Sequence, residues 1–175
     1  PPAPFSSPRH KEARRWADIN PTEAEIGKYA ANTFGALKVS FANLIYDLSK
    51  MAGKSMNEKG VKIKINYDNI RRILTEDARI GGAWLDISYG DYRGYGGYCF
   101  PKDTEAIMAY WRQLIKNRPH DKEQVLYKKG LKILESMREY NNALLAFQGL
   151  TSDDVGHHDE ELARLIRRLK KSNRK

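Results

Sequence analysis

The stretch "GYGGYCFPKD", residues 94–103, places the single cysteine of the chain, Cys99, between three glycines and a proline. Glycine permits backbone angles and close approaches that side chains prevent. Pro101 predicts the first turn of a helix, so Cys99 would lie just before a helix N-terminus, where oriented amides favour the thiolate. Lys102 adds a cation, and Asp103 adds a carboxylate four residues after the thiol. This set suits covalent catalysis by a thiolate on a carbonyl, although a single cysteine is more often a small buried apolar residue.

A second pair of residues could serve the same chemistry. Lys28 and Asn32 are four residues apart in a predicted helix and therefore share one face. An ammonium beside an amide can stabilise an alkoxide or oxyanion, which usually contributes most to lowering such barriers. On spacing alone, a solvated lysine and an ordinary polar position are the alternative interpretation.

The segment around this pair predicts one very long helix. Thr22 and Glu25 fit a capping box at its start, and Gly53 is its expected end. Apolar or small residues recur between them at helical spacing: Ile26, Tyr29, Ala30, Thr33, Phe34, Leu37, Phe41, Leu44, Ile45 and Leu48. A helix of nearly thirty residues is roughly 40 Å long and outruns a small bundle. We therefore expect a homodimer in which a second copy packs along residues 22–52.

The rest of the chain adds further helices. In order, the segments are a loop or short hairpin over 54–65, a short helix within 66–82 capped by Asn66 or Asp68, a glycine-rich and aromatic loop over 83–98, a helix from Pro101 toward Pro119, and a long amphipathic helix within 121–150. The predicted fold class is mainly α: a helical dimerisation domain built on one long central helix, with a glycine-rich catalytic loop.

Composition divides the chain into three parts. Residues 1–20 are rich in proline and read as a linker or arm, residues 21–150 form the helical domain, and residues 151–175 form a polar turn followed by a basic amphipathic helix. Residues 161–175 hold seven basic side chains and one acidic one, so six of the nine net positive charges lie there. Nucleic acid is therefore an improbable partner, and the apolar stripe of this tail is expected to pack on its own protein.

Other global features narrow the class of protein. A chain of 175 residues with 41% hydrophobic residues suits one soluble domain. No apolar run approaches the roughly 18–20 residues of a membrane span, and one cysteine forms no internal disulfide, so we expect a cytoplasmic protein. His157 and His158 have no further ligand at metal-binding spacing, so no metal site is expected. The chain begins at Pro1, which predicts a piece of a longer polypeptide.

Three blocks in order resemble the nucleotide-sugar dehydrogenase family, the UDP-glucose/GDP-mannose dehydrogenases. They are "AEIGKYAANTFGALKVSFAN" (24–43), similar to the family's long central helix, "EDARIGG" (76–82), and the nucleophile loop "GYGGYCFPKD" (94–103). The resemblance covers roughly residues 21–150. The tyrosine before the cysteine and the "PKD" after it fit the members that oxidise UDP-glucose better than those acting on N-acetylated sugars.

The resemblance implies a reaction and roles for particular residues. It implies oxidation of UDP-glucose to UDP-glucuronate with two NAD, in which Cys99 forms a thiohemiacetal and then a thioester. Lys28 would stabilise the developing oxyanion, and Asn32 would hold the reacting end of the sugar and the water. Asp103 would take part in proton transfer and hydrolysis.

It also implies contacts with substrate and cofactor. Arg79 resembles the arginine that reaches into the neighbouring subunit's sugar site. Tyr95 and Gly96 would lie against the substrate, and Lys102 would point toward the cofactor.

The sequence departs from the family in several places. No G-x-G-x-x-G follows a strand, so the two Rossmann-type domains of the family, which bind cofactor and nucleotide, are missing from these 175 residues. We therefore expect the isolated chain not to turn over. Leu44 replaces a common glutamate, Arg93 a common aromatic residue, and residues 54–65 look longer than the usual turn.

A second interpretation belongs to another class of protein. A non-catalytic helical module could reuse this core for dimerisation, with the basic tail binding an acidic partner. A cysteine of ordinary reactivity and salt-sensitive binding through residues 161–175 would favour it.

Overall fold

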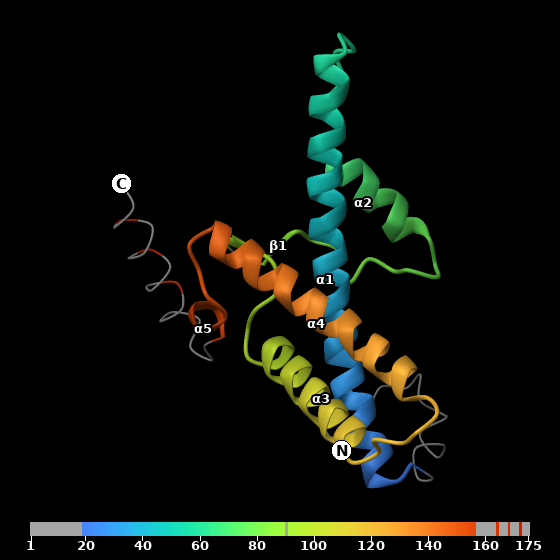
Figure 1. Ribbon diagram of the computed structural model, residues 1–175. Coiled ribbons are helices and arrows are strands. Elements are labelled where there is room, and N and C mark those ends of the chain that lie inside the picture. The colour runs from blue at the N-terminus through green and yellow to red at the C-terminus, as the bar shows by residue number, and fades with distance from the viewer. Residues whose placement is uncertain (1–18, 90, 157–163, 165–167, 169–171, 173–175) are drawn as a thin grey trace, which may run out of the picture.

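Helix α1 (Pro21–Glu58) is 38 residues long and runs the full height of the molecule (Figure 1). This computed structural model describes residues 19–89 and 91–156, together with the isolated positions Arg164, Arg168 and Ser172. Most of these residues are helical, and the only strands among them are two strands of two residues each that form a hairpin. The prediction of a mainly α fold built on one long helix is confirmed.

The start of α1 differs from the prediction by two residues. The Oδ1 of Asn20 accepts a hydrogen bond from the Glu23 amide at 3.0 Å, and the Glu23 carboxylate accepts one from the Asn20 amide at 2.9 Å. The capping box is therefore Asn20–Glu23, and the predicted box at Thr22 and Glu25 was wrong. Pro21 follows the cap because the first helical position needs no amide donor.

The end of α1 lies five residues beyond the predicted one. Gly53 is buried inside the helix, which continues to Glu58. A glycine ends a helix when it adopts a positive φ, and here that residue is Gly60, with a φ of +81°. Residues 61–66 have no regular structure. The segment 54–65 is thus partly helical and partly a loop, and it forms no hairpin.

Helix α2 (Tyr67–Glu76) lies beside the upper half of α1 (Figure 1). Of the two predicted caps, Asn66 is the one observed, because its Oδ1 accepts from the Asp68 amide at 3.0 Å. The Tyr67 hydroxyl donates to the carbonyl of Leu85 at 2.8 Å, and its ring meets Tyr46 edge-on at 5.9 Å. These contacts attach α2 and the following loop to α1.

A short antiparallel hairpin precedes the glycine-rich loop. Strands β1 (Ser88–Tyr89) and β2 (Tyr92–Arg93) pair with Ser88 opposite Arg93. The sequence predicted only a loop here, because two-residue strands leave no periodic pattern.

Three helices complete the described chain. Helix α3 (Cys99–Lys116) begins two residues before the predicted start at Pro101, and α4 (Gln124–Phe147) matches the predicted long helix. Helices α3 and α4 lie across the lower half of α1 (Figure 1). Helix α5 (Ser152–Val155) is a single turn where the sequence predicted a polar turn region.

The core has two parts, and both include residues of the loop before Cys99. One cluster joins α1, the loop and α4 through Ala36, Val39, Tyr95 and Met137; the other joins β2, α4 and α5 through Tyr92, Leu145, Leu150 and Val155. Gly35 allows α1 and α3 to approach closely, because a Cβ at this position would lie 2.6 Å from the ring of Phe100.

Two predictions fall mostly outside the described residues. Residues 1–18 of the predicted arm and most of the tail 157–175 are not described, while Arg164, Arg168 and Ser172 are helical and exposed. The proposed domain boundaries therefore stay predictions. Among the described helices, none combines the length and the apolar character needed to cross a bilayer. The described His, Cys, Asp and Glu side chains form no group of three that could hold a metal ion.

Candidate active site

Cys99 is the first residue of α3 and its side chain is exposed. No side chain caps this helix start, so the first amides of α3 remain oriented toward the region of the thiol. Asp103 follows one helical turn later and therefore lies on the same face of α3. The thiol of Cys99 thus lies at the N-terminus of the helix, and the carboxylate of Asp103 follows on the same face.

A hydrogen bond across two helices holds that carboxylate. The Nδ2 of Asn32 on α1 donates to Oδ2 of Asp103 on α3 at 2.5 Å. Lys28 lies one turn before Asn32 on α1, and its ammonium acts electrostatically on Asp103. The structure therefore brings Lys28, Asn32, Cys99 and Asp103 to one place where α1 and α3 meet.

Asp103 is fully buried yet ionised. Burial alone would raise its pKa, but hydrogen bonds from Lys102 and Asn32, together with the charges of Lys102 and Lys28, outweigh this effect and hold the pKa of Asp103 below its usual value. A buried carboxylate that keeps its charge at neutral pH can accept protons and hydrogen bonds.

Lys102 is the ion-pair partner of Asp103, and its side chain is 41% exposed. The hydrogen bond to Asp103 raises the pKa of Lys102. Its ammonium also lies 5.3 Å from the ring centre of Tyr98 and 5.9 Å from that of Tyr29. The Lys28 ammonium lies 5.5 Å from the centre of the same Tyr29 ring, so two cations lie near one aromatic ring. This corner of the site is electropositive.

The glycine loop before Cys99 fits closely against α4 and α5. A Cβ at Gly94 would lie 2.7 Å from the Oδ1 of Asn141, and one at Gly96 would lie 2.8 Å from the Cβ of Val155. Gly97 has open space around it, but its φ of +72° favours glycine. Each of these glycines thus has a physical reason to be glycine.

Alternate residues of the same loop are held by their backbones. The Gln148 side chain accepts from the Arg93 amide at 2.7 Å and donates to the Arg93 carbonyl at 2.9 Å. The Asn141 side chain accepts from the Tyr95 amide at 2.8 Å and donates to the Tyr95 carbonyl at 3.1 Å.

One more backbone contact completes this series. The Gly97 amide donates to the carbonyl of Val155 at 2.6 Å. We refer to the contacts of residues 93, 95 and 97 with Gln148, Asn141 and Val155 as the amide ladder.

The side chain of Arg93 fixes the start of the loop to α1. Its guanidinium donates to Oδ1 of Asn43 at 3.0 Å and to Oδ1 of Asp47 at 2.8 Å. It also lies 4.4 Å from the ring centre of Tyr46. The Tyr140 hydroxyl on α4 donates to Asp47 as well, at 3.2 Å. The Arg93 side chain therefore links the hairpin to α1, and Asp47 joins this contact to Tyr140 of α4.

Three predicted substrate or cofactor contacts lie in different settings. Tyr95 is only 3% exposed and packs in the core, where burial raises the pKa of its hydroxyl. Gly96 lies under α5, and Lys102 lies beside Asp103. These positions leave the predicted contacts of Tyr95, Gly96 and Lys102 as predictions.

Arg79 lies on a separate loop after α2, with its side chain 88% exposed and paired with Asp77 at 2.6 Å. The Lys38 ammonium on α1 holds this loop by donating to the carbonyls of Ile80 at 3.0 Å and Gly81 at 3.1 Å. The pairing lowers the pKa of Asp77 and raises that of Arg79. Arg79 is thus exposed on the surface and paired with Asp77.

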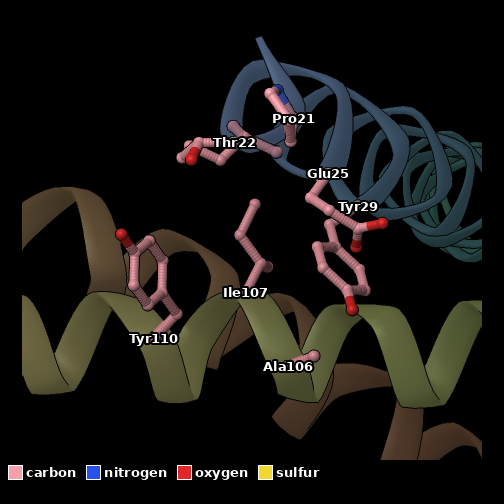
Figure 2. A pocket seen from close by; sticks show the side chains of 8 residues that line it. Pro21, Thr22, Glu25, Tyr29, Ala106, Ile107 and Tyr110 are labelled. Carbon is pink, nitrogen blue, oxygen red and sulfur yellow. The ribbon is translucent and has the colours of Figure 1, made fainter.

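An apolar groove of about 370 Å³ lies between the first turns of α1 and the middle of α3. Figure 2 shows Ile107 rising from α3 between the rings of Tyr110 and Tyr29. Tyr29 lies one turn from Asn32, and Ala106 lies one turn from Asp103. The groove therefore starts beside the hydrogen bond that joins the two helices.

Sequence reasoning missed the residues that hold the glycine loop. Asn141 and Gln148 are seven residues apart and continue the buried face of α4 that includes Met137 and Leu144. A polar amide within a buried apolar stripe needs hydrogen-bond partners, so this pattern was a usable signal. Val155 acts through its backbone carbonyl, for which the sequence carries no signal.

Comparisons with known proteins agree with the resemblance seen in the sequence. The model of the UDP-glucose/GDP-mannose dehydrogenase family, central domain, matches residues 22–143. A UDP-glucose 6-dehydrogenase from Pseudomonas aeruginosa is 37% identical over 86 residues, or 49% of this chain and 16% of the relative. The UDP-glucose 6-dehydrogenase AglM of Haloferax volcanii is 41% identical over 88 residues, or 50% of this chain and 17% of the relative.

A longer match extends over more of the chain. The UDP-glucose 6-dehydrogenase YwqF of Bacillus subtilis is 34% identical over 119 residues, or 68% of this chain and 21% of the relative. The chain thus spans about a sixth to a fifth of the length of these relatives. No solved structure matches. With the family model covering most of its length, the chain belongs to the UDP-glucose/GDP-mannose dehydrogenase family and contains the central domain of that family.

Proposed function

We propose that this chain is the nucleophile-bearing, dimer-forming core of a UDP-glucose 6-dehydrogenase that oxidises UDP-glucose to UDP-glucuronate. The observation that carries the proposal is the hydrogen bond between Asn32 and Asp103. It joins the helix that bears Lys28 to the helix that starts at Cys99, so that a nucleophile, a cation, an amide and a carboxylate share one corner.

The first covalent step would take place at Cys99. Its thiolate sulfur adds to the carbonyl carbon of an aldehyde at C6 of the sugar; a C–S bond forms, and the π pair moves to the oxygen. The Lys28 ammonium and the second N–H of Asn32 would stabilise that negative oxygen. The first N–H of Asn32 already binds Asp103 and orients the amide.

The last step would use Asp103. Water attacks the thioester carbon, the Asp103 carboxylate accepts a proton from that water, and Cys99 leaves as the thiolate. The lowered pKa of Asp103 keeps it a carboxylate and hence an acceptor at neutral pH. Its bonds to Asn32 and Lys102 fix its direction.

NAD would supply the hydride acceptor for both oxidations, as the family implies. The described residues do not hold a dinucleotide on their own, because their only strands form a two-residue antiparallel hairpin and no glycine turn joins a parallel strand to a helix. We therefore propose that another domain of a longer polypeptide binds NAD. The charge of Lys102, which the resemblance places toward the cofactor, remains partly exposed.

A homodimer through α1 is the second part of the proposal. Large apolar side chains lie exposed on α1 with spacings of seven, three, four and three residues: Phe34, Phe41, Leu44, Leu48 and Met51. Such spacing is typical of a helix that packs along another helix. We call this set the α1 stripe. The exposed position of Arg79 is compatible with a reach into a neighbouring subunit.

The exposed thiol of Cys99 bears on the cellular compartment of the protein. Cys99 is exposed and has no disulfide partner, and a thiolate nucleophile needs a reducing environment to stay active. We propose a cytoplasmic enzyme.

The test uses the full-length polypeptide that contains these residues, alongside the 175-residue chain. With UDP-glucose and NAD, we expect the full-length enzyme to form NADH and its Cys99→Ser variant to lose at least 1,000-fold in kcat. The 175-residue chain should form no NADH. A matched control is Ser136→Ala on the exposed side of α4, which should keep full activity.

Two outcomes would contradict the proposal. One is a Cys99→Ser enzyme with near-normal activity, which would remove the nucleophile from the mechanism. The other is NADH formation by the 175-residue chain itself, which would show that it holds NAD without a further domain.

A further inference from the structure

The amide ladder resembles one side of a β-sheet that is built from side chains. Residues 93, 95 and 97 are alternate positions of a loop that bends at Gly94 (φ +100°) and turns at Gly97 (φ +72°), and each of them is bonded through its backbone, as the hydrogen-bonded residues of a strand are. Asn141 and Gln148 are seven residues apart, two helical turns, so both project from one face of α4. Each amide makes two bonds to one residue, accepting from its N–H and donating to its C=O.

Burial distinguishes these amides from ordinary surface residues. Asn141 is 2% exposed, and both of its polar atoms are used by Tyr95. The amide group of Gln148 binds Arg93 and also donates to the carbonyl of Leu144 at 2.8 Å, which ties it to its own helix. Asn141 cannot turn away without leaving buried polar groups unpaired, and turning Gln148 away would break three bonds of a half-buried amide.

The third contact comes from outside the matched family region. Val155 lies in α5, beyond residue 143 where the family match ends, and its carbonyl accepts from the Gly97 amide. The short helix is held in place by its own capping box, in which the Asp154 carboxylate accepts from the Thr151 amide at 2.7 Å. The segment after α4 thus fixes the residue two positions before Cys99.

We propose that Asn141 and Gln148, together with the Val155 carbonyl, are positioning elements that set the path of residues 93–97 and thereby the place of Cys99 at the mouth of α3. The role assigned to Cys99 rests on the function proposed above. Gly94 and Gly96 belong to the same device, because side chains there would push the loop off Asn141 and Val155. The contacts themselves are independent of that function.

The test uses the whole 175-residue chain and needs neither UDP-glucose nor NAD. Gln148→Met keeps the length of the half-buried side chain and removes its bonds, and Asn141→Leu does the same at the buried position. Amide exchange of Arg93, Tyr95 and Gly97 is measured residue by residue by NMR. The rate at which iodoacetamide alkylates Cys99, the only cysteine, reports how the thiol is held at the N-terminus of α3.

The chain offers a matched control in Asn57. This asparagine makes the same pair of bonds to Ile63, accepting from its amide and donating to its carbonyl, both at 3.3 Å, at the other end of the molecule. Asn57→Leu should speed exchange at Ile63 alone and leave the Cys99 rate unchanged.

We expect Gln148→Met to speed exchange of the Arg93 amide at least tenfold and to slow alkylation of Cys99 at least threefold, because the amides of α3 no longer face a fixed thiol. Asn141→Leu should do the same at Tyr95. Gln148→Glu, which keeps the acceptor and loses the donor, should restore protection of the Arg93 amide in part. Three outcomes would overturn the proposal. They are an unchanged amide exchange rate at residues 93–97, an unchanged rate of Cys99 alkylation, and an equal rise in exchange at all amides of the chain. Since no step uses substrate, these results are separate from the NADH assay of the proposed function.

Discussion

The two halves of α1 bury their side chains in different ways. Every buried residue of this helix lies between Thr33 and Asn43, except Ser49 and Gly53. The lower half packs against α3 and α4, whereas the upper half meets α2 and, at Asp47, the side chains of Arg93 and Tyr140 (Figure 1). Yet the upper half carries Leu44, Leu48 and Met51, all about half exposed or more.

This difference indicates two tasks for one helix. In the lower half, the side chain of Asn32 reaches α3 and holds Asp103. Four of the five exposed apolar side chains of the α1 stripe lie in the upper half, at the spacing of a helix seam. This is the part of α1 that the proposed dimer would use.

The largest effect is expected from breaking the α1 stripe. Leu44→Glu combined with Leu48→Glu removes two half-exposed leucines whose remaining burial would contribute roughly 1.5–3 kcal/mol per protomer, so the proposed dimer should dissociate. Sedimentation velocity at several concentrations should show a monomer, while exchange at residues 93–97 stays slow. Ile133→Glu, at an apolar position of α4 that is 64% exposed, is the control and should leave the dimer intact. A variant that stays dimeric would place the dimer contact elsewhere.

A smaller effect is expected from the lower, packed half of the molecule. Gly96→Ala places a Cβ against the hydroxyl of Tyr92 and 2.8 Å from Val155, and overpacking of this kind costs about 1–3 kcal/mol. Chemical denaturation should show this loss in the free energy of unfolding, with no change in dimer formation. A stability equal to that of the parent chain would mean that α5 does not press on the loop.

The charge of Asp103 should contribute at most as much as that packing. Asp103→Asn removes charge-assisted hydrogen bonds, so we expect a loss of about 2 kcal/mol at pH 7. Because the pKa of Asp103 is lowered in the folded state, its contribution is present above its unfolded pKa, near 3.8, and is lost as pH falls through the lower folded value. The stability difference between the two proteins should therefore shrink below about pH 4.

Asp77 provides the comparison for this acid effect. Its pKa is also lowered, by the hydrogen bonds of Arg79, but the pair is exposed. Asp77→Asn should therefore change the acid unfolding curve less than Asp103→Asn does. A larger change for Asp77→Asn than for Asp103→Asn would show that Asp103 is not the more acid-sensitive of these two carboxylates.

The smallest effect should be a gain. Gly27 lies exposed in the first turns of α1, and a Cβ there would meet nothing within 4 Å. Gly27→Ala should raise the free energy of unfolding by about 0.5–1 kcal/mol, because alanine loses less backbone entropy in a helix. Thermal unfolding of the two variants checks this: the unfolding temperature should rise for Gly27→Ala, where the new Cβ has open space, and fall for Gly96→Ala, where it does not.

Helical periodicity predicted the long elements because each buries a continuous face. Helices α1 and α4 follow from apolar spacing alone, and the family motif marked Cys99, Asn32 and Asp103. The ends were less predictable. Gly53 resembles a residue that ends a helix, but it is buried inside α1. The helix ends before Gly60, which has a positive φ, and the sequence does not show which of the two glycines adopts that φ.

The supports of the site were harder to find than its reactive groups. The partners of Arg93 lie 46 to 55 residues away along the chain, and pairings this distant leave no local pattern. The segment 151–156 reads as a polar turn, yet Asp154 and Val155 are buried there. The group that contacts Gly97 is the backbone carbonyl of Val155. Every residue type has this carbonyl, so the sequence carries no sign of the contact.

The amide ladder has a consequence for how this site would respond to its surroundings. Carboxamides carry no net charge and do not titrate, so the bonds of Asn141 and Gln148 to residues 93 and 95 do not depend on the charge state of the Lys102–Asp103 pair, whereas the Arg93 side chain and α5 are held by the carboxylates of Asp47 and Asp154. Frame and reactive charge are thus separable: an engineer could retune the electrostatics around Cys99 without loosening the loop that carries it.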